Sequence, residues 1–442
     1  MDLNSGKELP VKYFSTNNTE LRYSFKEAVI KGLAPDKGLF FPVSIPKLSD
    51  AFFKNLPNLS LPEIGFEVAK HFVGDDISDA NLREITEEVL NFPIPVVPVE
   101  EGISTLELFH GPTCAFKDVG ARFMSRCLSA FAKKSQEDVT ILVATSGDTG
   151  SAVANGFLGV EGVQVIILYP AGKVSKIQEQ QLTTMGQNIT ALEVDGTFDD
   201  CQALVKTAFA DKELNEKLNL TSANSINIAR LLPQSFYYFY AWAQMQPTNK
   251  KLVFSVPSGN YGNLTGGLLA KQMGLPIHSF VAAANKNKVV PDYLASGKYE
   301  PKASVQTISN AMDVGAPSNF ARMMEMYQDR HADVIKDVNG AWNTDEETEE
   351  AMLDVYNRTK YILDPHGAVA YLGLKKYLNV KDELGIFLET AHPAKFKDTV
   401  EAVLNTEIKI PDYLQECLGK KKLSFLISKE FNDFKAYLLK ID

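Results

Sequence analysis

One pattern after residue 100 constrains the fold of this chain more than any other: a buried strand, a glycine-rich turn and a helix follow one another repeatedly. In the first copy the strand covers residues 139–145 and the turn 146–150. In the second the strand covers 252–256 and the turn 257–263, and a weaker third copy surrounds 385–393. Strands that alternate with helices form parallel sheets covered on both faces, so the sequence predicts an α/β fold. Ligands of such sheets bind where strands end, which makes the three turns the first candidates for a site.

The two ends of the chain differ from this pattern. Ser24 and Glu27 form a capping box that opens a helix, and two amphipathic stretches follow before a proline cluster at residues 93–98. We therefore expect a small helical N-terminal region over residues 1–95. At the other end, residues 422–440 predict a short strand and an amphipathic helix that pack against the rest of the protein.

Composition excludes several classes of protein. The chain has 442 residues, 45% of them hydrophobic, and a net charge of −10, which argues against a nucleic-acid or anionic-membrane surface. No apolar run approaches the ~20 residues that span a bilayer, and the first residues lack a signal-peptide pattern. The four cysteines are far apart and the six histidines are scattered. These observations favour a cytoplasmic protein with reduced thiols and no metal site.

Lys117 is the residue with the most specific chemistry. It follows an apolar run and the His-Gly-Pro turn at residues 110–112, at what the pattern predicts to be a helix start. Apolar surroundings and a positive helix end both destabilise the ammonium group and lower its pKa. A lysine amine of lowered pKa is what covalent catalysis at a carbonyl needs. Taken in isolation, the alternative is a surface lysine in the first turn of an amphipathic helix.

Residues 258–263 form the clearest candidate for an anion site. Gly259 and Gly262 let successive backbone N–H groups face one point, and the following helix adds its positive end. Neither a Walker A loop nor a dinucleotide-binding fingerprint is present, so a single phosphate monoester fits best. The competing interpretation is a plain strand-to-helix turn with glycines for steric reasons.

The turn after residue 145 is a second cradle, rich in hydroxyl groups. Ser146, Thr149 and exposed amides are suited to hold a carboxylate, although a capped helix start explains the same residues equally well. Ser146 follows a strand, which raises the possibility of a serine nucleophile, but the G-x-S-x-G pattern is missing.

Two further segments carry polar groups that are weak signals alone. Residues 224–230 offer amides, a hydroxyl and Arg230, which is either an oxyanion clamp or a surface ion-pair residue. Thr390 ends a buried strand, where its hydroxyl can bond a ring nitrogen or simply cap a turn. Asp364 predicts a helix cap, and His366 after it reads first as a structural histidine.

As an ordered set, the motifs resemble the threonine synthases, pyridoxal-phosphate enzymes that make threonine from O-phosphohomoserine. The longer members found in many bacteria and fungi are the best match. The segments that carry the resemblance are 13–16, 32–39, 109–122, 144–150, 225–234, 257–263, 313–320 and 390–396.

The resemblance implies a fold: the type II architecture of pyridoxal-phosphate enzymes. It consists of two open parallel-sheet domains with helices on both faces, here preceded by the small N-terminal helical region. The large cofactor-binding domain is expected over residues 96–138 and 206–442, and a small mobile α/β domain over 139–205. We expect a monomer or a homodimer.

The resemblance also implies roles for individual residues. Lys117 is the catalytic lysine that joins the cofactor, with Phe116 beside the ring and Thr390 facing the pyridine nitrogen. Gly259, Asn260, Tyr261, Gly262 and Asn263 hold the cofactor phosphate. The substrate carboxylate is assigned to Thr145, Ser146, Gly147 and Thr149, and the substrate phosphate to Asn224, Ser225 and Arg230.

The expected reaction uses O-phospho-L-homoserine, from which phosphate leaves Cγ and water adds at Cβ to give L-threonine. Lys117 acts as the base, and Arg230 with nearby donors assists the departing phosphate. Two alternatives remain open at this point. One is a phospholyase or dehydratase on the same scaffold that releases 2-oxobutyrate, and the other is a non-catalytic anion- or nucleotide-binding α/β protein.

Overall fold

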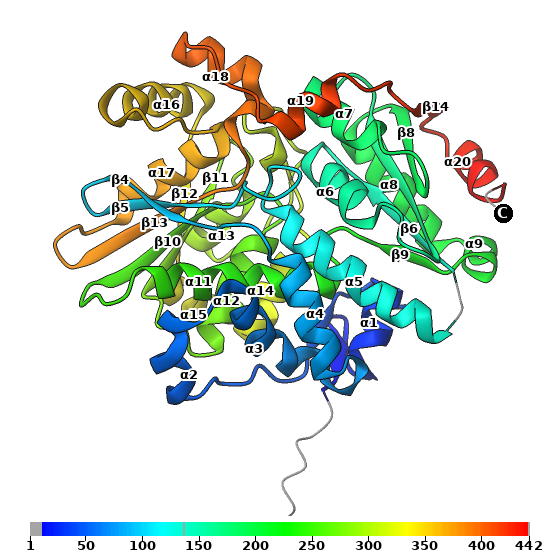
Figure 1. Cartoon of the computed structure of the whole chain (residues 1–442), viewed down its shortest axis with the longest axis horizontal. Helices are drawn as coiled ribbons and strands as arrows, with labels where there is room; N and C mark the ends of the chain where they lie inside the picture. The colour runs from blue at the N-terminus through cyan, green and yellow to red at the C-terminus, as the bar shows by residue number, and fades with distance from the viewer. Residues whose placement is uncertain (1–10, 136–137, 441–442) are drawn as a thin grey trace, which may run out of the picture.

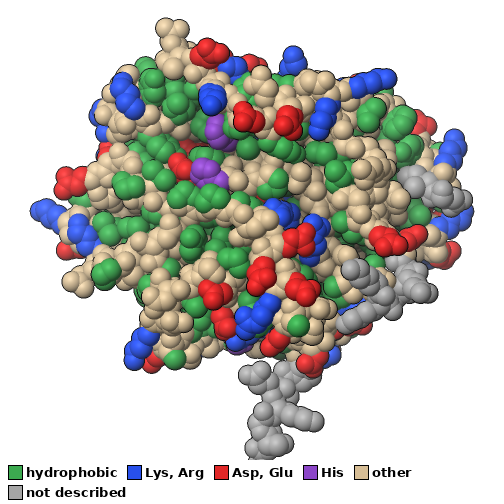
Figure 2. Space-filling view, in the orientation of Figure 1, with side chains coloured by type: hydrophobic (Ala, Val, Ile, Leu, Met, Phe, Trp, Pro, Cys, Tyr) green, Lys and Arg blue, Asp and Glu red, His purple; other side chains and the backbone are tan. Residues whose placement is uncertain are grey.

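The computed structural model of the chain describes residues 11–135 and 138–440. Two open sheets lie side by side, and the long helix α5 (Lys117–Ser135) runs between them (Figure 1). Helices cover both faces of each sheet, as the repeated strand–turn–helix pattern predicts, so the α/β expectation is confirmed. On the face seen in Figure 2, acidic and basic side chains intermingle.

The larger sheet has the strand order β12-β11-β10-β13-β5-β4, and all neighbours are parallel except the edge strand β4. Because side chains alternate along a strand, its two faces carry different residues. Phe254 packs against Tyr238 on one face, whereas Ser255 on the other face lies against Gly373. The strands are β4 (Val96–Glu100), β5 (Ile103–Glu107), β10 (Lys251–Pro257), β11 (Ser279–Ala284), β12 (Val338–Trp342) and β13 (Glu383–Glu389).

The helices of this unit follow from the same alternation. Tyr238 lies on a helix that packs beside α12 under one face, and Gly373 lies on α17 over the other. The helices are α10 (Ile228–Leu231), α11 (Phe236–Gln244), α12 (Gly262–Gln272), α13 (Val289–Ser296), α14 (Phe320–Met326), α15 (His331–Asp337), α16 (Asp345–Thr359), α17 (Pro365–Tyr377), α18 (Lys397–Leu404) and the short 3-10 turn η5 (Pro393–Phe396).

The smaller sheet is fully parallel, with the order β14-β8-β7-β6-β9. Ile167 faces Gly150 on α6, while Leu142 on the other face belongs to the cluster that includes Leu204 of α8. Its strands are β6 (Val139–Ala144), β7 (Val163–Pro170), β8 (Ile189–Asp195), β9 (Leu220–Ser222) and β14 (Ser424–Ser428). Its helices are α6 (Asp148–Phe157), α7 (Lys176–Thr183), α8 (Phe198–Ala210), α9 (Lys212–Lys217), α19 (Asp412–Leu418) and α20 (Phe431–Leu438).

Two strands of the smaller sheet lie outside the range 139–205 that the sequence suggested for the small domain. They are β9 and β14, and both fall in the range assigned to the large domain. Both strands are short, and β14 pairs with a strand some 230 residues earlier, so no local pattern reveals the pairing. The strand and helix expected within residues 422–440 are confirmed as β14 and α20.

The N-terminal region contains a small antiparallel sheet besides the expected helices. The capping box forms as predicted, because Glu27 N donates to Ser24 Oγ and Ser24 N donates to Glu27 Oε2. The expected helices are present, and three strands that the sequence analysis did not predict pair with one another across turns. The elements are β1 (Tyr13–Ser15), β2 (Asn18–Tyr23), α1 (Phe25–Lys31), β3 (Phe40–Pro42), α2 (Asp50–Asn55), α3 (Leu61–Val73) and α4 (Asp79–Val89).

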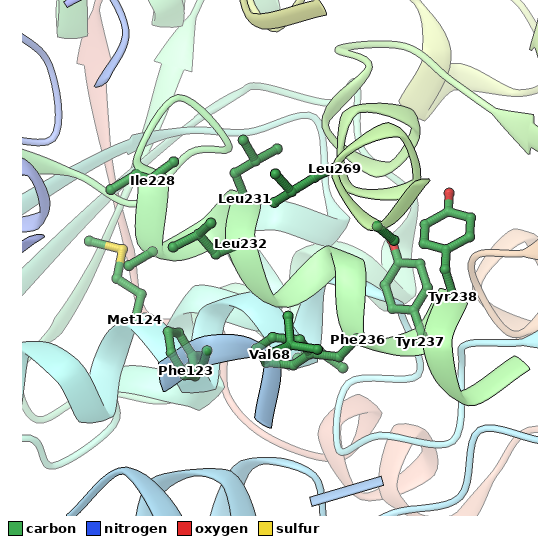
Figure 3. Packing of buried hydrophobic residues seen from close by; sticks show 14 of the residues in the cluster. Val68, Phe123, Met124, Ile228, Leu231, Leu232, Phe236, Tyr237, Tyr238 and Leu269 are labelled. Carbon is green, nitrogen blue, oxygen red and sulfur yellow. The ribbon is translucent and has the colours of Figure 1, made fainter. Parts of the chain in front are cut away.

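The main core lies beneath α5 and joins the units. Figure 3 shows part of it, with side chains from α3, α5, α10, α11 and α12 in one cluster. Phe123 of α5 meets Phe236 edge to face at 5.8 Å between ring centroids. A Cβ at Gly120 would lie 2.8 Å from the carbonyl oxygen of Arg230, so only glycine lets α5 approach α10 this closely. The core therefore fixes the start of α5, where Lys117 lies, relative to Arg230.

No helix within the described ranges is long and apolar enough to cross a membrane. The four cysteines are buried and none forms a disulfide. They are Cys114, Cys127, Cys201 and Cys417.

Candidate active site

A cavity with an empty volume of about 1080 Å³ opens at the carboxyl ends of strands from both sheets. It joins Lys117, the turn 259–263 and Arg230, which the sequence places far apart. Every residue expected at the site lines this cavity except Gly147. Among the parts of the chain that the structure describes, no group of His, Cys, Asp and Glu side chains is arranged to hold a metal ion.

Backbone hydrogen bonds between two loops position Lys117. Phe116 N donates to Thr390 O over 2.9 Å, and His392 N donates to Cys114 O over 3.0 Å. The loop before α5 is thus joined to the loop after β13, which places Lys117 and Thr390 on the same cavity. The Thr390 hydroxyl has no hydrogen-bond partner in residues 11–135 and 138–440, so it is free to bond a ring nitrogen.

The surroundings of Lys117 favour its neutral amine. Burial lowers the pKa of Lys117 from 10.5 to about 8; Asp148 opposes this shift, while Lys395 and Arg230 add to it. At pH 7 about one molecule in ten then carries an uncharged amine, compared with fewer than about one in a thousand for an ordinary lysine. The side chain remains partly accessible from the cavity. A buried amine that is readily deprotonated and still accessible suits covalent attachment of a carbonyl.

The turn 259–263 is shaped to bind an anion with its backbone. Tyr261 has a left-handed φ of 59° and precedes α12 without a side-chain cap. Within the described chain, the backbone N–H groups of residues 259–263 have no protein acceptor. The Asn263 side chain donates to Pro257 O over 2.7 Å and accepts from Ser258 Oγ, which holds the turn in place. Free N–H groups at a helix start bind a phosphate well.

Gly259 lets a second loop close over this turn. A Cβ at Gly259 would lie 2.8 Å from the Cα of Met312 and 2.9 Å from the carbonyl oxygen of Ala311. His366 holds that loop from behind: its Nε2 accepts from Ala311 N over 3.2 Å, and its Nδ1 lies 2.9 Å from Asp364 Oδ1. The predicted cap at Asp364 is present, since this carboxylate also accepts from the backbone at the start of α17.

Arg230 is a buried cation that forms no ion pair with a carboxylate of the described residues, although the charge of Asp118 acts on it. Its side chain is 4% exposed, its Nη1 donates to Ala223 O, and its Nε has no partner among the described residues. No ion pair of Arg230 with a described carboxylate occurs. Burial lowers the pKa of Arg230 to about 10, so the guanidinium stays charged at neutral pH. Because an uncompensated buried charge is costly, this arginine is suited to an anionic ligand.

Ser225 and Asn260 connect the arginine side of the cavity to the glycine turn. The Ser225 hydroxyl accepts from Asn260 Nδ2 over 2.9 Å and from Asn319 Nδ2 over 3.1 Å. With both acceptances made, the Ser225 O–H is left to donate to a ligand. Asn224 also lines the cavity, but its amide donates to Ala144 O over 3.0 Å and thereby ties this segment to the end of β6.

The loop after β6 is held by its own first residue. Thr145 Oγ1 accepts from Gly147 N and Gly150 N, each over 2.9 Å. Gly147 faces away from the cavity, and a Cβ there would lie 2.4 Å from the Gln178 side chain. The hydroxyls of Ser146 and Thr149 line the cavity and have no partner in the described chain. They are the groups of this loop suited to a carboxylate.

Several cavity residues escaped the motif analysis. Asp148 lines the cavity although only its neighbours carried an expectation, and Lys395 contacts it from a segment noted only for its likeness to relatives. His366 has the structural role that the sequence suggested, yet it also lines the cavity. Asn319 and Arg322 support the site from the beginning of α14. Asn319 belongs to the segment 313–320 that carries the resemblance but had no assigned role, and Arg322 in the first turns of α14 carries no local signal that distinguishes it.

Arg322 offers a stability test of this support. It is fully buried and donates to the carbonyl oxygens of Phe40, Ser225 and Ile226. We expect Arg322→Met to lower the free energy of unfolding by roughly 3 kcal/mol, because several buried acceptors lose their donor. Urea denaturation followed by circular dichroism measures this change. The control is Arg330→Met, which removes only an exposed ion pair with Asp333, and equal effects of the two substitutions would contradict the expectation.

Three family models match the chain. "Pyridoxal-phosphate dependent enzyme" matches residues 104–385, "Threonine synthase N terminus" matches 12–90, and "Threonine synthase, C-terminal" matches 367–437. The threonine synthase of Haemophilus influenzae is 46% identical over 429 residues, which cover 97% of this chain and 99% of the relative. That of Escherichia coli is 46% identical over 422 residues, which cover 95% and 97%.

Solved structures agree with these relatives. The crystal structure of Escherichia coli threonine synthase superposes with a TM-score of 0.92 and 44% identity, covering 98% of this chain and 100% of that one. A structure of PLP-bound threonine synthase from Brucella melitensis superposes with a TM-score of 0.90 and 33% identity, covering 97% and 98%. The type II fold expected from the motifs is therefore confirmed. By its sequence over nearly its whole length, its sheet topology and the family models that it matches, the chain belongs to the threonine synthase family of pyridoxal-phosphate-dependent enzymes.

Proposed function

We propose that this chain converts O-phospho-L-homoserine and water into L-threonine and phosphate, using pyridoxal 5′-phosphate as its cofactor. One observation carries the choice of substrate: Arg230 is a buried guanidinium without an acidic partner among the described residues, and it lines the same cavity as Lys117. The glycine turn provides a separate site for the cofactor phosphate, so the arginine is left for a second phosphate. A plain serine or threonine substrate would leave this charge uncompensated.

The residues of the cavity fit the cofactor. The N–H groups of residues 259–263 would hold its phosphate, Lys117 would join its aldehyde carbon, and Phe116 would lie against its ring. Thr390, whose hydroxyl has no partner in the described chain, would face the ring nitrogen. A hydroxyl there does not force the nitrogen to stay protonated, unlike a carboxylate. When bound, the cofactor supplies the electron sink for the carbanion chemistry.

The substrate-facing residues have distinct tasks. Ser146 and Thr149 would hold the substrate carboxylate, while Arg230 and the Ser225 hydroxyl would hold the substrate phosphate and stabilise it as it leaves. Lys117 would remove the proton at Cα and carry protons near Cβ, because its lowered pKa lets the amine act as a base near neutral pH.

Oxygen labelling tests the reaction. The protein is incubated with O-phospho-L-homoserine in water enriched in ¹⁸O, and the products are analysed by mass spectrometry. The proposed reaction breaks the Cγ–O bond, so phosphate carries no label and threonine carries one labelled hydroxyl. A phosphatase would give labelled phosphate and homoserine, and a phospholyase would give 2-oxobutyrate and ammonia. Either of these outcomes as the main product would reject the proposal.

A second cleft leads toward the cavity and carries positive charge. It adjoins the cavity at Asn224 and Asn260, and its lining includes Lys31, Lys37 and Lys206 but no aspartate or glutamate of the described chain. None of the three lysines forms an ion pair with a described carboxylate. In a chain with a net charge of −10, this cleft is suited to attract an anionic substrate.

We expect the double variant Lys37→Glu and Lys206→Glu to lower kcat/KM about tenfold at low ionic strength while kcat changes less than about twofold. Added salt should reduce this difference, because it screens exposed charges. Steady-state kinetics at salt concentrations from about 10 to about 300 mM measure both effects, because the screening length shortens over this range. Lys421→Glu, an exposed lysine outside the cleft, is the control. A loss that does not vary with salt would show that steering is not the cause.

We also propose that the protein works in the cytoplasm, as a monomer or a homodimer. Four buried cysteines without disulfides are consistent with a reducing compartment. Light scattering of the purified protein distinguishes the two assembly states.

A further inference from the structure

A buried ion pair lies behind Lys117. Lys395 Nζ is 2.8 Å from Asp148 Oδ1, and the two residues are 1% and 3% exposed. Asp148 opens α6 of the smaller sheet unit, whereas Lys395 lies on η5 after β13 of the larger one. Lys395 Nζ also donates to Thr113 O over 3.0 Å, on the loop that leads into Lys117. The pair therefore connects both sheet units with the loop that carries the lysine.

The two oxygens of Asp148 have different surroundings. Oδ1 accepts from Lys395 and also from Gln178 Nε2, which is 2.8 Å away on α7. Oδ2 has no hydrogen-bond partner among the described residues, and Asp148 lines the cavity. Lys117 and Asp148 do not form an ion pair within 4.0 Å, so Asp148 acts on Lys117 through space. The Asp148 carboxylate thus interacts with two lysines: it forms an ion pair with Lys395, and its charge acts on Lys117.

The charges of this ion pair act on the pKa of Lys117. Burial raises the pKa of Asp148, but the charges of Lys395 and Lys117 and the hydrogen bonds from Lys395 and Gln178 together lower it by more, so it lies well below the usual range. Asp148 raises the pKa of Lys117, and Lys395 lowers it. Asp148, Lys395 and Arg230 are the charged groups that act on the pKa of Lys117, and the other titratable side chains that line the cavity are Tyr261, Asp313 and His366.

We propose that Lys395 is a positioning residue that holds Asp148 as a shared counter-charge, so that the Lys117 nitrogen can gain and lose its proton without leaving a bare charge in the site. If Lys395 were absent, Asp148 would have Lys117 as its nearest cation and would keep that amine protonated. With Lys395 present, the Asp148–Lys395 pair has no net charge, so Asp148 stabilises the protonated form of Lys117 less. The inference concerns how Lys117 works and rests on its role in the proposed function.

The two members of the pair predict shifts of opposite sign, which a merely structural role does not. Removing the positive charge with Lys395→Met should raise the pKa of Lys117 by at least about one unit. Removing the negative charge with Asp148→Asn should lower it by a similar amount. The double variant should return close to the unmodified protein, because the two contributions oppose each other. It also avoids leaving one buried charge unpaired, and it is therefore the variant expected to fold most readily.

Two measurements made without substrate report the proton on Lys117. The first is the rate at which cofactor-free protein captures pyridoxal phosphate as a function of pH, followed by absorbance. The second is the pH midpoint of the visible absorption of the loaded protein. Lys397→Met is the matched control, since Lys397 follows the same 3-10 turn but pairs only with Glu401 and the backbone. Thermal unfolding monitored by circular dichroism verifies that each variant is folded.

The outcomes separate this inference from the proposed function. Opposite shifts in the single variants, with a double variant near the starting value, support it. Shifts in the same direction, or no shift in Lys395→Met relative to Lys397→Met, overturn it. If single variants do not fold, a midpoint of the double variant more than about one unit from the unmodified protein overturns it. Because no substrate is present, these results are independent of whether labelled threonine forms.

Discussion

Lys117→Ala is expected to abolish threonine formation, with kcat at least about 10⁴-fold lower. In the proposed function, the substitution removes both the nitrogen that joins the cofactor and the base that moves the Cα proton. The cavity and the anion-binding turn remain, so pyridoxal phosphate should still bind, but its visible absorption should match that of the free aldehyde. Absorbance spectra of the purified protein and an assay for released phosphate measure the two effects.

Lys217→Ala is the control for this substitution, because Lys217 is an exposed residue whose ion pair with Glu213 lies within one helix. The unmodified protein adds a pH test. Capture of the cofactor requires the neutral amine, so the capture rate should rise as the pH is raised through about 8, the pKa of Lys117, and then level off. A midpoint near 10.5, that of an ordinary lysine, would contradict the burial argument. Residual turnover above about a hundredth of normal in Lys117→Ala would contradict its role as the base.

Arg230→Met is expected to lower kcat/KM for O-phospho-L-homoserine by about 10³-fold, equivalent to about 4 kcal/mol. Methionine fills much of the same space but cannot neutralise a phosphate. Arg230→Lys should recover only part of this loss, because an ammonium group keeps the charge but not the planar set of donors. The cofactor spectrum should be unchanged in both variants, since the proposed site of the cofactor phosphate is the glycine turn and not Arg230. Steady-state kinetics with the phosphorylated substrate measure the loss.

Stability distinguishes binding from structural support at this arginine. Arg230 has no described acidic partner, so Arg230→Met should leave the melting temperature unchanged or higher, in contrast to Arg322→Met. Arg358→Met is the matched control, because Arg358 is a surface arginine that forms ion pairs with carboxylates. If Arg230→Met melted as early as Arg322→Met while the remaining folded protein kept normal kcat/KM, the arginine would be structural and the choice of a phosphorylated substrate would lose its basis.

Local sequence patterns predicted much of this fold, because each strand, turn and helix of the repeated unit is encoded by adjacent residues. The turns at 146–150 and 257–263 and the loop at Thr390 all lie on one cavity, as strand-end logic predicts. The short strands were harder to anticipate. The strands β1, β3 and β9 have only 3 residues each, which is too few for a periodic signal. The strand β2 is exposed along nearly its whole length, so its residues do not alternate, and β14 joins its sheet from the far end of the chain.

The burial of Arg230 is a feature that local sequence patterns do not predict. From its neighbours alone, a surface ion pair was the better interpretation, since arginine is mostly exposed and paired. Packing of α5 against α10, permitted by Gly120, buries it instead and leaves it without an acidic partner in the described chain. Lys395 and Asp148 are a similar case: they are 247 positions apart in the chain, and nothing local indicates that they meet.

The order of residues was enough to establish the alternation of strands and helices, the glycine turns and the family to which the chain belongs, because these depend on neighbours along the backbone. The protonation of Lys117, the uncompensated charge of Arg230 and the sharing of Asp148 depend on burial and on distances between residues that folding brings together. Electrostatic energies in a protein change steeply with distance and solvent exposure. The chemical character of these three side chains was therefore set by packing.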